Sequence, residues 1–381
     1  MKVFFVTNFC AHYRVKTFET LARVVDVEFL FFSEGGERYW DVRHGTKLGD
    51  FSGGYLKGLR IFGVRVTPSL VGKLLFREHD IVIKCITGRF ALPVSYIAAR
   101  LRGKPFILWT NLWYHPLTLF HRLSRPITTW IYRHADAVVA FGSHVEAYLV
   151  EGGVSPERIF ISTQAVDSEL FGRRVTENEK QELRAKLAAP EEKIVLYVGR
   201  FDPIKGLDDL VRAFTHVSRK IPAKLVLVGE GETKEGIQNL VSELGLHEDV
   251  VFESYISNSA LPEYYAVADV LVLPSITLRG VKEVWGLVIN EAMNQGCPVV
   301  ATDAVGAVVG GLVQHGKTGI VVQEQNSEVL ASALETLLAD KDAQKRMRLA
   351  ATEEIARWTY ERQVKGFVEA IEHVRNKSGA N

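Results

Sequence analysis

The feature that most constrains the fold is a regular alternation of short β-branched or aromatic segments with segments of helical period. Strands are expected at 2–7, 26–32, 81–86, 105–110, 136–141 and 158–163, then at 193–199, 223–229, 249–253, 269–274, 297–302 and 318–322. Helices are expected between them, for example at 14–25, 92–102, 117–134, 206–219 and 286–296. This order of elements requires parallel sheets flanked by helices, so we predict an α/β fold.

The alternation of predicted strands and helices is interrupted once. A chain of 381 residues is long enough for two or three domains. Residues 171–192 are polar and charge-rich, and the alternation restarts after them. We predict an N-terminal domain at 1–170, a linker at 171–192 and a C-terminal domain at 193–359, with a helix at about 360–381 packing back on the first domain. Both domains should be doubly wound and Rossmann-like, with strand carboxyl ends facing an interdomain cleft.

Composition excludes several classes of protein. Hydrophobic residues make up 47% and charged residues 24%, which excludes disorder as the main state. The three cysteines lie far apart, so neither a disulfide framework nor a zinc site is indicated. The apolar run at 2–6 is too short for a signal peptide or a membrane span. We therefore expect a cytoplasmic location.

The positive charge is concentrated in the first half of the chain. Residues 1–170 carry 21 Lys+Arg and 15 Asp+Glu, a balance of +6, and the remainder carries −5. This asymmetry indicates an anionic partner or the inner face of a membrane, or it has arisen by drift. The charges are scattered rather than clustered, so nucleic acid is not an expected partner.

Two cations follow the first strand of the second domain. Arg200 comes directly after Gly199, and Lys205 lies five residues further on, before a predicted helix. A guanidinium fork, a point charge and the amides of a helix start together suit a diphosphate. The alternative is a solvated loop with no ligand.

Two acidic residues flank the start of a later helix. Glu283 lies in a loop just before the helix, and Glu291 lies about two turns inside it. One carboxylate can accept hydrogen bonds from the hydroxyls of a ribose, and the other can accept hydrogen bonds from those of a bound sugar. The amides at Gly286 and Leu287 can contribute to phosphate binding, and we place Trp285 at the same site.

These segments carry a family resemblance. Residues 194–323 resemble the nucleotide-sugar-binding domain of retaining glycosyltransferases of family four, which have the GT-B fold. The matching residues are Gly199-Arg200, Lys205-Gly206, Val228 to Gly231, Tyr265 to Val270, Leu273-Pro274-Ser275, the Glu-x7-Glu segment from Glu283 to Glu291, and Gly296 to Val300. The resemblance implies that Arg200 and Lys205 bind the donor diphosphate, Glu291 the ribose and Glu283 the donor sugar. The base is expected near Ser254 to Ile256, with Tyr255 and Ile256 as binding residues, and mostly in contact with backbone.

The N-terminal domain is less similar to the family. Many members have two glycines after the first strand, where this chain has Thr7 to Arg14. Asn8, His12 and Arg14 follow the strand's carboxyl end and are acceptor-side candidates. The loop from Trp109 to Pro116 resembles the family's histidine-bearing loop, so His115 is a catalytic candidate and Asn111 the fallback. A structural histidine in an aromatic loop is the alternative.

The stretch 113–133 mixes aromatic residues with arginines and histidines. On a helix it forms either a membrane-contacting surface, as expected for a lipid-linked acceptor, or a core helix with a basic outer face. Both interpretations remain open at this stage.

These observations predict a metal-independent transferase. The chain has a single Asp-x-Asp, at 340–342, which is better explained by helix capping than by metal binding. We expect no cofactor and a retaining transfer of a hexose to a glycan or lipid-linked acceptor in polysaccharide or glycoconjugate biosynthesis. A UDP-sugar is the favoured donor and GDP-mannose the next. The alternatives are a GT-B phosphorylase, a nucleotide-sugar epimerase or a non-enzymatic two-lobed solute-binding protein.

Overall fold

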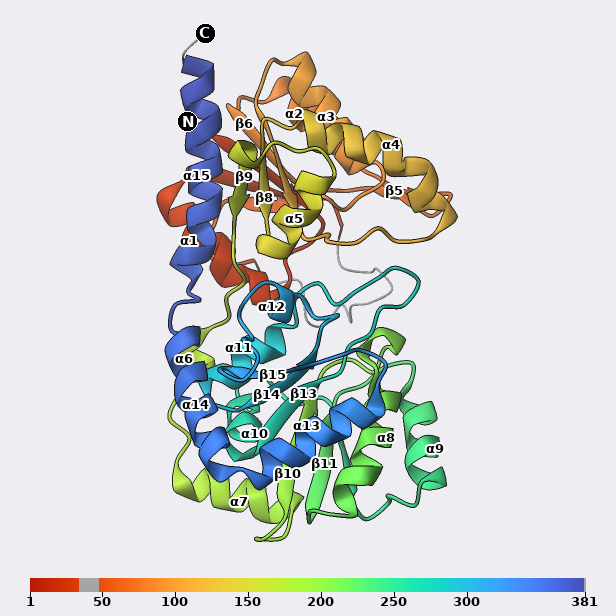
Figure 1. The fold of residues 1–381 in the computed structure, drawn as a ribbon. Coiled ribbons are helices and arrows are strands. Elements are labelled where there is room, and N and C mark those ends of the chain that lie inside the picture. Colours follow the sequence, from red (N-terminus) through yellow and green to blue (C-terminus); the bar gives the residue numbers. More distant parts are fainter. Residues whose placement is uncertain (34–47, 380–381) are drawn as a thin grey trace. The chain divides into compact units, whose positions relative to one another are not determined.

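The computed structural model describes residues 1–33 and 48–379, and these residues form two compact units. The first comprises residues 1–113, 119–165 and 359 onward, and the second comprises 114–118 and 166–358. Each unit is built around a parallel sheet with helices on both faces (Figure 1). The predicted pair of Rossmann-like α/β domains is confirmed.

The first unit contains a seven-stranded sheet in the order β3-β2-β1-β6-β7-β8-β9. Its central strands are fully buried, because residues such as Val3 to Val6 are apolar on both faces. The strands are β1 (Val3–Thr7), β2 (Val27–Phe31), β3 (Gly53–Tyr55), β6 (Ile81–Cys85), β7 (Phe106–Thr110), β8 (Ala137–Ala140) and β9 (Ile159–Ile161). A separate antiparallel pair is formed by β4 (Leu59–Ile61) and β5 (Val64–Val66).

Helices cover both faces of this sheet. On one face, α15 packs against α1, β8 and β9 (Figure 1). On the other face, α3 packs against β6 and β7, and α2 lies beside α3. The helical segments are η1 (His12–Arg14), α1 (Val15–Val24), α2 (Pro68–Phe76), α3 (Ala91–Leu101), α4 (Leu119–His134), α5 (Ser143–Glu151), η3 (Pro156–Arg158) and α15 (Tyr360–Gly379). Residues 380 and 381 of the predicted last helix lie outside the described residues.

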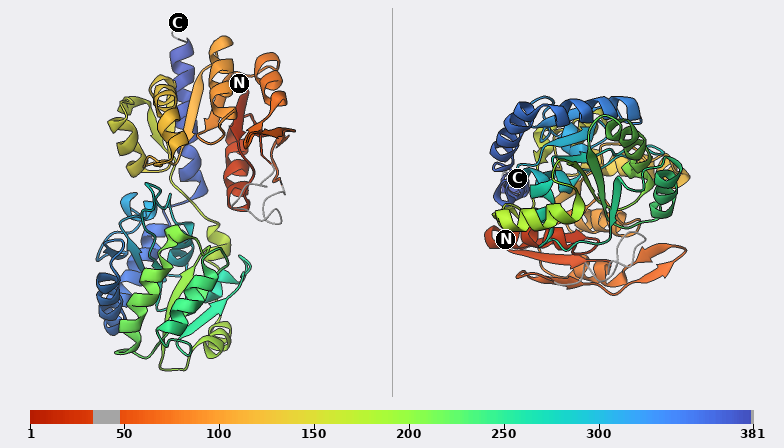
Figure 2. Two further views of the ribbon diagram at one scale, coloured as in Figure 1. Left: turned by 90° about the vertical axis from the view of Figure 1, so that its right-hand side faces the viewer. Right: turned by 90° about the horizontal axis from the view of Figure 1, so that it is seen from below.

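The second unit contains a six-stranded parallel sheet in the order β12-β11-β10-β13-β14-β15. Its strands are β10 (Lys193–Val198), β11 (Ala223–Val228), β12 (Val250–Glu253), β13 (Val270–Leu273), β14 (Val299–Thr302) and β15 (Gly319–Val322). The helical segments are α6 (Ser168–Phe171), α7 (Glu177–Leu187), η4 (Pro203–Lys205), α8 (Leu207–Ser218), α9 (Lys234–Glu243), α10 (Leu261–Val267), α11 (Leu287–Asn294), α12 (Gly306–Val309), α13 (Ser327–Ala339) and α14 (Lys341–Ile355). Helix α13 packs against α8 on one face, and α14 packs against α11 on the other (Figure 2).

The predicted linker at 171–192 is wrong. Phe171 belongs to the core of the second unit, and residues Glu177–Leu187 form helix α7, which packs against α10. A capping box starts this helix: Thr176 accepts from the amide of Glu179, whose side chain accepts from the amide of Thr176. The charges of α7 are its solvent-facing side, so charge density marked a surface helix rather than a connection. The N-terminal part of the first unit ends at Ala165, not at residue 170.

Helix α4 does not follow the core-helix interpretation of the stretch 113–133. Leu123 is 73% exposed, Ile127 60% and Trp130 49%, and only Ile131 and Tyr132 of this helix are buried. The apolar residues at positions 119, 123, 127 and 130 recur at helical spacing, so they form one exposed stripe.

Candidate active site

The second sheet has a switch point at its centre. Strands β10 and β13 are neighbours in the sheet but are separated by β11 and β12 along the chain. The connections that leave β10 and β13 therefore run to opposite sides of the sheet, and the loops after both strands lie next to a gap between them. Arg200 and Lys205 follow β10, and Ser275 and Glu283 follow β13.

The loop after β10 is held in a tight conformation. Asp202 caps η4 by accepting from the amide of Ile204 at 3.2 Å. Gly206 has a φ of +62°, and a Cβ there would lie 2.1 Å from the carbonyl oxygen of Pro274. Only glycine permits this close approach, which brings Lys205 to the loop after β13.

Lys205 and Glu283 meet at this edge of the sheet. The Lys205 Nζ is hydrogen-bonded to Glu283 Oε2, and the Oγ of Ser275 donates to the same oxygen at 3.3 Å. The side chains of Lys205 and Glu283 are 13% and 15% exposed, so the pair is mostly shielded from water. Arg200 is more open, with 53% of its side chain exposed and Asp202 at 3.4 Å. A diphosphate at this position would meet two cations, and a sugar hydroxyl would meet a carboxylate.

The predicted histidine loop contributes to the second unit. The segment Tyr114–Thr118 groups with that unit, and the amide of Leu117 donates to the carbonyl of Arg279 at 3.1 Å. Burial, and after it the charge of Glu283, raises the pKa of Tyr114 to about 12. The segment that contains His115 is thus close to the Glu283 carboxylate.

Helix α11 carries the second carboxylate. It begins after Gly286, whose φ is +91°. Tyr265 donates a hydrogen bond to Glu291 Oε2 at 2.6 Å, and burial raises the pKa of Glu291 to about 7. Glu291 therefore lies between the protonated and the ionised form near neutral pH. The first amides of α11, from Gly286 and Leu287, face its N-terminal end as the helix geometry requires.

Trp285 is a core residue, contrary to the prediction that it binds the donor. It is 3% exposed, its indole N–H donates to the buried Asn290 at 2.7 Å, and its ring packs against Trp358. The side chain therefore holds the start of α11 in place rather than meeting a ligand. Tyr255 is 60% exposed and Ile256 half-buried, in the loop after β12.

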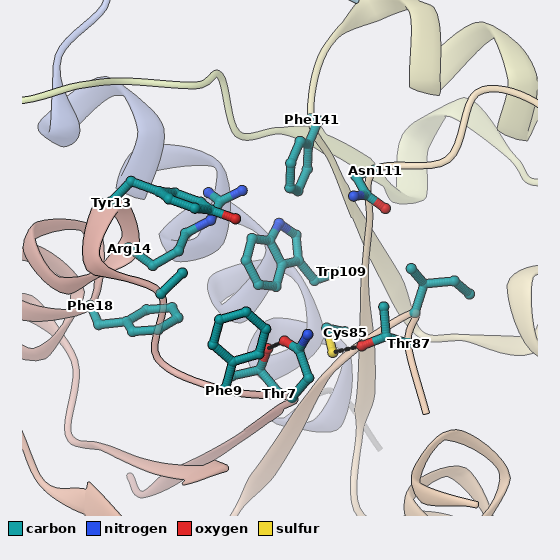
Figure 3. Close-up of a pocket in the computed structure, with 13 residues that line it drawn as sticks. Thr7, Phe9, Tyr13, Arg14, Phe18, Cys85, Thr87, Trp109, Asn111 and Phe141 are labelled. Carbon is teal, nitrogen blue, oxygen red and sulfur yellow. Dashed lines mark hydrogen bonds between the residues drawn. The ribbon is translucent and has the colours of Figure 1, made fainter. Parts of the chain in front are cut away.

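The first unit has a cavity of about 140 Å³ at its own switch point, between β1 and β6 (Figure 3). Three of the predicted acceptor-side residues, Asn8, Arg14 and Asn111, line it. His12 is exposed on η1 and does not line this cavity. The structure thus brings together three of the four residues, because they follow β1 and β7, which flank β6.

Comparison with known proteins decides the class of this molecule. The model of Glycosyltransferase Family 4 matches residues 19–170, and the model of Glycosyl transferases group 1 matches residues 179–354. The structure of Anabaena Alr3699/HepE in complex with UDP has the same fold, with a TM-score of 0.77, 20% identity and coverage of 98% of this chain and 100% of that one. The chain is a GT-B-type glycosyltransferase.

Two relatives of this glycosyltransferase align along most of its length. Alpha-D-kanosaminyltransferase of Streptomyces kanamyceticus is 29% identical over 304 residues, which cover 77% of this chain and 76% of the relative. GDP-mannose-dependent alpha-(1-6)-phosphatidylinositol monomannoside mannosyltransferase of Mycobacterium tuberculosis is 29% identical over 293 residues, with coverage of 75% and 74%. Neither the phosphorylase or epimerase alternative nor the solute-binding alternative is favoured.

Two further features of the glycosyltransferase bear on the predictions. Asp340, from the single Asp-x-Asp, caps α14 by accepting from the amide of Ala343 at 2.8 Å. Within residues 1–33 and 48–379, no helix is long and apolar enough to span a membrane.

Sequence reasoning missed the supports of the site. It did not assign a role to Ser275, which donates to Glu283, or to Tyr265, which donates to Glu291. Both residues lie in segments whose resemblance was noted, but their partners are 8 and 26 positions away. No local spacing signals such pairs. Trp109, the next-to-last residue of β7, likewise has no local signal that assigns it a role.

Proposed function

We propose that this glycosyltransferase transfers a hexose from a nucleoside diphosphate sugar to an acceptor hydroxyl, with retention at the anomeric carbon and without a divalent metal. The observation that carries the proposal is the convergence of Lys205, Glu283 and Ser275 at the switch point of the second sheet. In this proposal Arg200 and Lys205 bind the diphosphate, Glu291 the ribose, and Tyr255 and Ile256 flank the base.

The leaving group needs positive charge. Breaking the bond between the anomeric carbon and the phosphate oxygen leaves negative charge on the diphosphate, and fixed cations in a shielded site stabilise that charge. Lys205 is well placed for this role because 13% of its side chain is exposed. The amides of Gly286 and Leu287 add donors at a helix start. This set of groups supports metal-independent catalysis.

Retention follows if the acceptor attacks from the face that the diphosphate leaves. The bond from the anomeric carbon to the acceptor oxygen forms as the bond to phosphate breaks, and the acceptor proton passes to the leaving phosphate oxygen. Glu283 then orients the sugar hydroxyls and stabilises positive charge on the ring, and His115 contacts the sugar from the neighbouring segment. No covalent glycosyl intermediate on Glu283 is required.

We favour UDP-hexose as the donor and GDP-mannose as the next candidate. The structural neighbour from Anabaena was solved with UDP, which supports a uridine nucleotide. The mycobacterial relative is named as GDP-mannose-dependent, which supports the second candidate.

We further propose that the acceptor is lipid-linked or a glycan precursor and that the enzyme acts in the cytoplasm, in peripheral contact with a membrane. The exposed stripe of α4 lies among His121, Arg122, Arg125 and Arg133, and α4 contains no acidic residue. A groove of about 740 Å³ between α4 and the end of α5 is lined by the same three arginines. Apolar side chains beside arginines suit an anionic lipid surface.

Isothermal titration with UDP, GDP and ADP, each in EDTA and then in magnesium, tests the donor proposal. Binding of one nucleotide in EDTA, abolished by Lys205→Met, is the expected result. Arg375→Met, in the last turns of α15, serves as the matched control and should bind the nucleotide as the wild type does. A folded protein that binds none of the nucleotides would overturn the proposal.

A further inference from the structure

The cavity of the first unit contains a cation with no carboxylate partner. Arg14 lies at the end of η1, with its guanidinium 5.0 Å from the centre of the Trp109 ring and 4.9 Å from that of Phe141 (Figure 3). Across residues 1–33 and 48–379, no Asp or Glu lies within ion-pair distance of it. Burial lowers the pKa of this guanidinium from its ordinary value.

Aromatic rings compensate such a charge only in part. A ring quadrupole attracts a cation, but less strongly than a carboxylate or phosphate with direct hydrogen bonds. A partly buried cation without an anion is therefore an unfavourable arrangement unless a ligand completes it. The hydroxyl of Tyr13 is the hydrogen-bonding group that accompanies Arg14.

A second donor in the same cavity also lacks a partner. Trp109 is 6% exposed, and its indole Nε1 is buried with no hydrogen-bond partner in the described structure. Figure 3 shows this nitrogen on the side of the ring that faces the Arg14 guanidinium. A buried N–H group is nearly always paired in a folded protein. A buried N–H group without a partner, next to a guanidinium without an anion, indicates one missing acceptor.

The rest of the lining agrees with an anionic acceptor. Asn8, Thr87 and Asn111 add polar groups, and none of the residues that line the cavity is acidic. Most of the lining residues lie at or just after the carboxyl ends of β1, β6, β7 and β8, which is where open parallel sheets bind ligands, and the others lie on η1 and α1. Among the described residues, the cavity thus has donors from several elements and no carboxylate that would repel an anion.

We propose that this cavity binds an anionic group of the acceptor, a carboxylate or a phosphate, between the Arg14 guanidinium and the Trp109 indole N–H. The acceptor is then an acidic sugar or a phosphorylated one rather than a neutral glycan. This inference rests on the proposed transferase function, because it assigns the acceptor of the same enzyme. Arg14 is a binding residue in this scheme and takes no part in breaking the donor bond.

Titration calorimetry with four probes tests the proposal: glucose, glucuronate, glucose 6-phosphate and inorganic phosphate, each with and without saturating UDP. We expect glucuronate or glucose 6-phosphate to bind at least about tenfold more tightly than glucose, as charge-assisted hydrogen bonds predict. The stronger of the two identifies the source of the charge. Inorganic phosphate tests the phosphate arm without a sugar.

Three variants test which residues bind the anionic probe. Arg14→Gln should weaken binding of the anionic probe about tenfold or more, and Trp109→Phe should weaken it less, because it removes the N–H and keeps a ring. Arg23→Gln, at an exposed arginine of α1, is the matched control and should have no effect. The unfolding transition of the first unit in scanning calorimetry shows that each variant is folded, because Arg14 and Trp109 both belong to that unit.

Two results would overturn the proposal. One is equal binding of glucose and of both charged sugars, and the other is unchanged binding of the anionic probe by Arg14→Gln. Either result with intact UDP binding leaves the proposed transferase function standing. Loss of UDP binding by the wild type is a separate failure, of the donor site, and the titrations without UDP still test the cavity.

Discussion

At the scale of single residues, we expect the ion pair between Lys205 and Glu283 to link donor binding to catalysis. Glu283→Gln removes the charge that stabilises the sugar, so the rate of transfer should fall about 100-fold or more. The same change releases Lys205 from its partner, so UDP should bind as tightly as before or up to about fivefold more tightly. Initial rates and titration calorimetry measure the two effects separately.

The control for this prediction is Glu243→Gln, at an exposed glutamate of α9, which should behave as the wild type. Glu283 does not have the proposed role if Glu283→Gln retains full activity. Parallel loss of UDP binding and activity would instead show that Glu283 supports the diphosphate site.

Glu291 makes stability depend on pH. Burial raises its pKa to about 7, whereas an exposed glutamate has a pKa of about 4.3. The folded state therefore binds a proton that the unfolded state releases, and this contribution to stability is present at pH 4 and lost as the pH rises through 7. Glu291→Gln stays neutral and can still accept from Tyr265. The free energy of unfolding of Glu291→Gln, measured in urea, should therefore rise relative to that of the wild type by about 1 to 3 kcal/mol as the pH goes from 5 to 8.

Nucleotide binding should depend on pH in the opposite direction. The ionised Glu291 is the better acceptor for ribose hydroxyls, so the affinity of the wild type for UDP should rise as the pH goes from 6 to 8. The phosphate of UDP also titrates near pH 6, but it does so equally with both proteins. A pH dependence in Glu291→Gln as steep as in the wild type would rule out Glu291 as its source.

At the scale of elements, α4 is the surface proposed for membrane contact. Leu123 is 73% exposed in the middle of its apolar stripe. Leu123→Glu should abolish co-sedimentation with vesicles of phosphatidylcholine and phosphatidylglycerol, because it places a negative charge at the anionic lipid surface. The wild type should bind these vesicles and bind pure phosphatidylcholine vesicles weakly.

The matched control is Leu349→Glu, since Leu349 is 67% exposed on α14 of the other unit. Equal sedimentation of all three proteins would show that α4 is not the contact. No sedimentation of the wild type with either vesicle would show that the enzyme does not bind lipid surfaces of this kind.

The elements also show how far a sequence alone leads. The strands were predictable because buried parallel strands, such as β10 with its Ile194 to Val198 run, are apolar on both faces. The charges of α7 resemble those of a polar linker and hide the helix, although Thr176 and Glu179 have the spacing of a capping box. For α4, the helical spacing predicts an apolar stripe, but it does not predict what covers that stripe. The cavity was predictable only in part. Arg14 and Trp109 are far apart in the sequence, and only the order of the strands in the sheet brings them close together.

At the scale of the whole molecule, the chain crosses between its two units, and we expect each unit to have its own stability because each has its own internal packing. Helix α15 follows the second unit in sequence but belongs to the first, where Phe367 is 0% exposed and lies 5.5 Å from the rings of Phe5 and Trp109. Phe367→Ala should cost the first unit about 3 to 5 kcal/mol. The proposed nucleotide site belongs to the second unit, so UDP should bind this variant as it binds the wild type.

Scanning calorimetry with and without UDP distinguishes the two units. UDP should raise the transition of the unit that binds it, by the mass-action stabilisation that any native-state ligand provides. Phe367→Ala should lower the other transition, and Phe76→Ala, at a phenylalanine that is 83% exposed on α2, should lower neither. Because α15 closes the first unit only after the second has been synthesised, the first unit depends on a segment that its own N-terminal residues cannot supply. A single transition that UDP and Phe367→Ala shift together would show that the two units unfold as one.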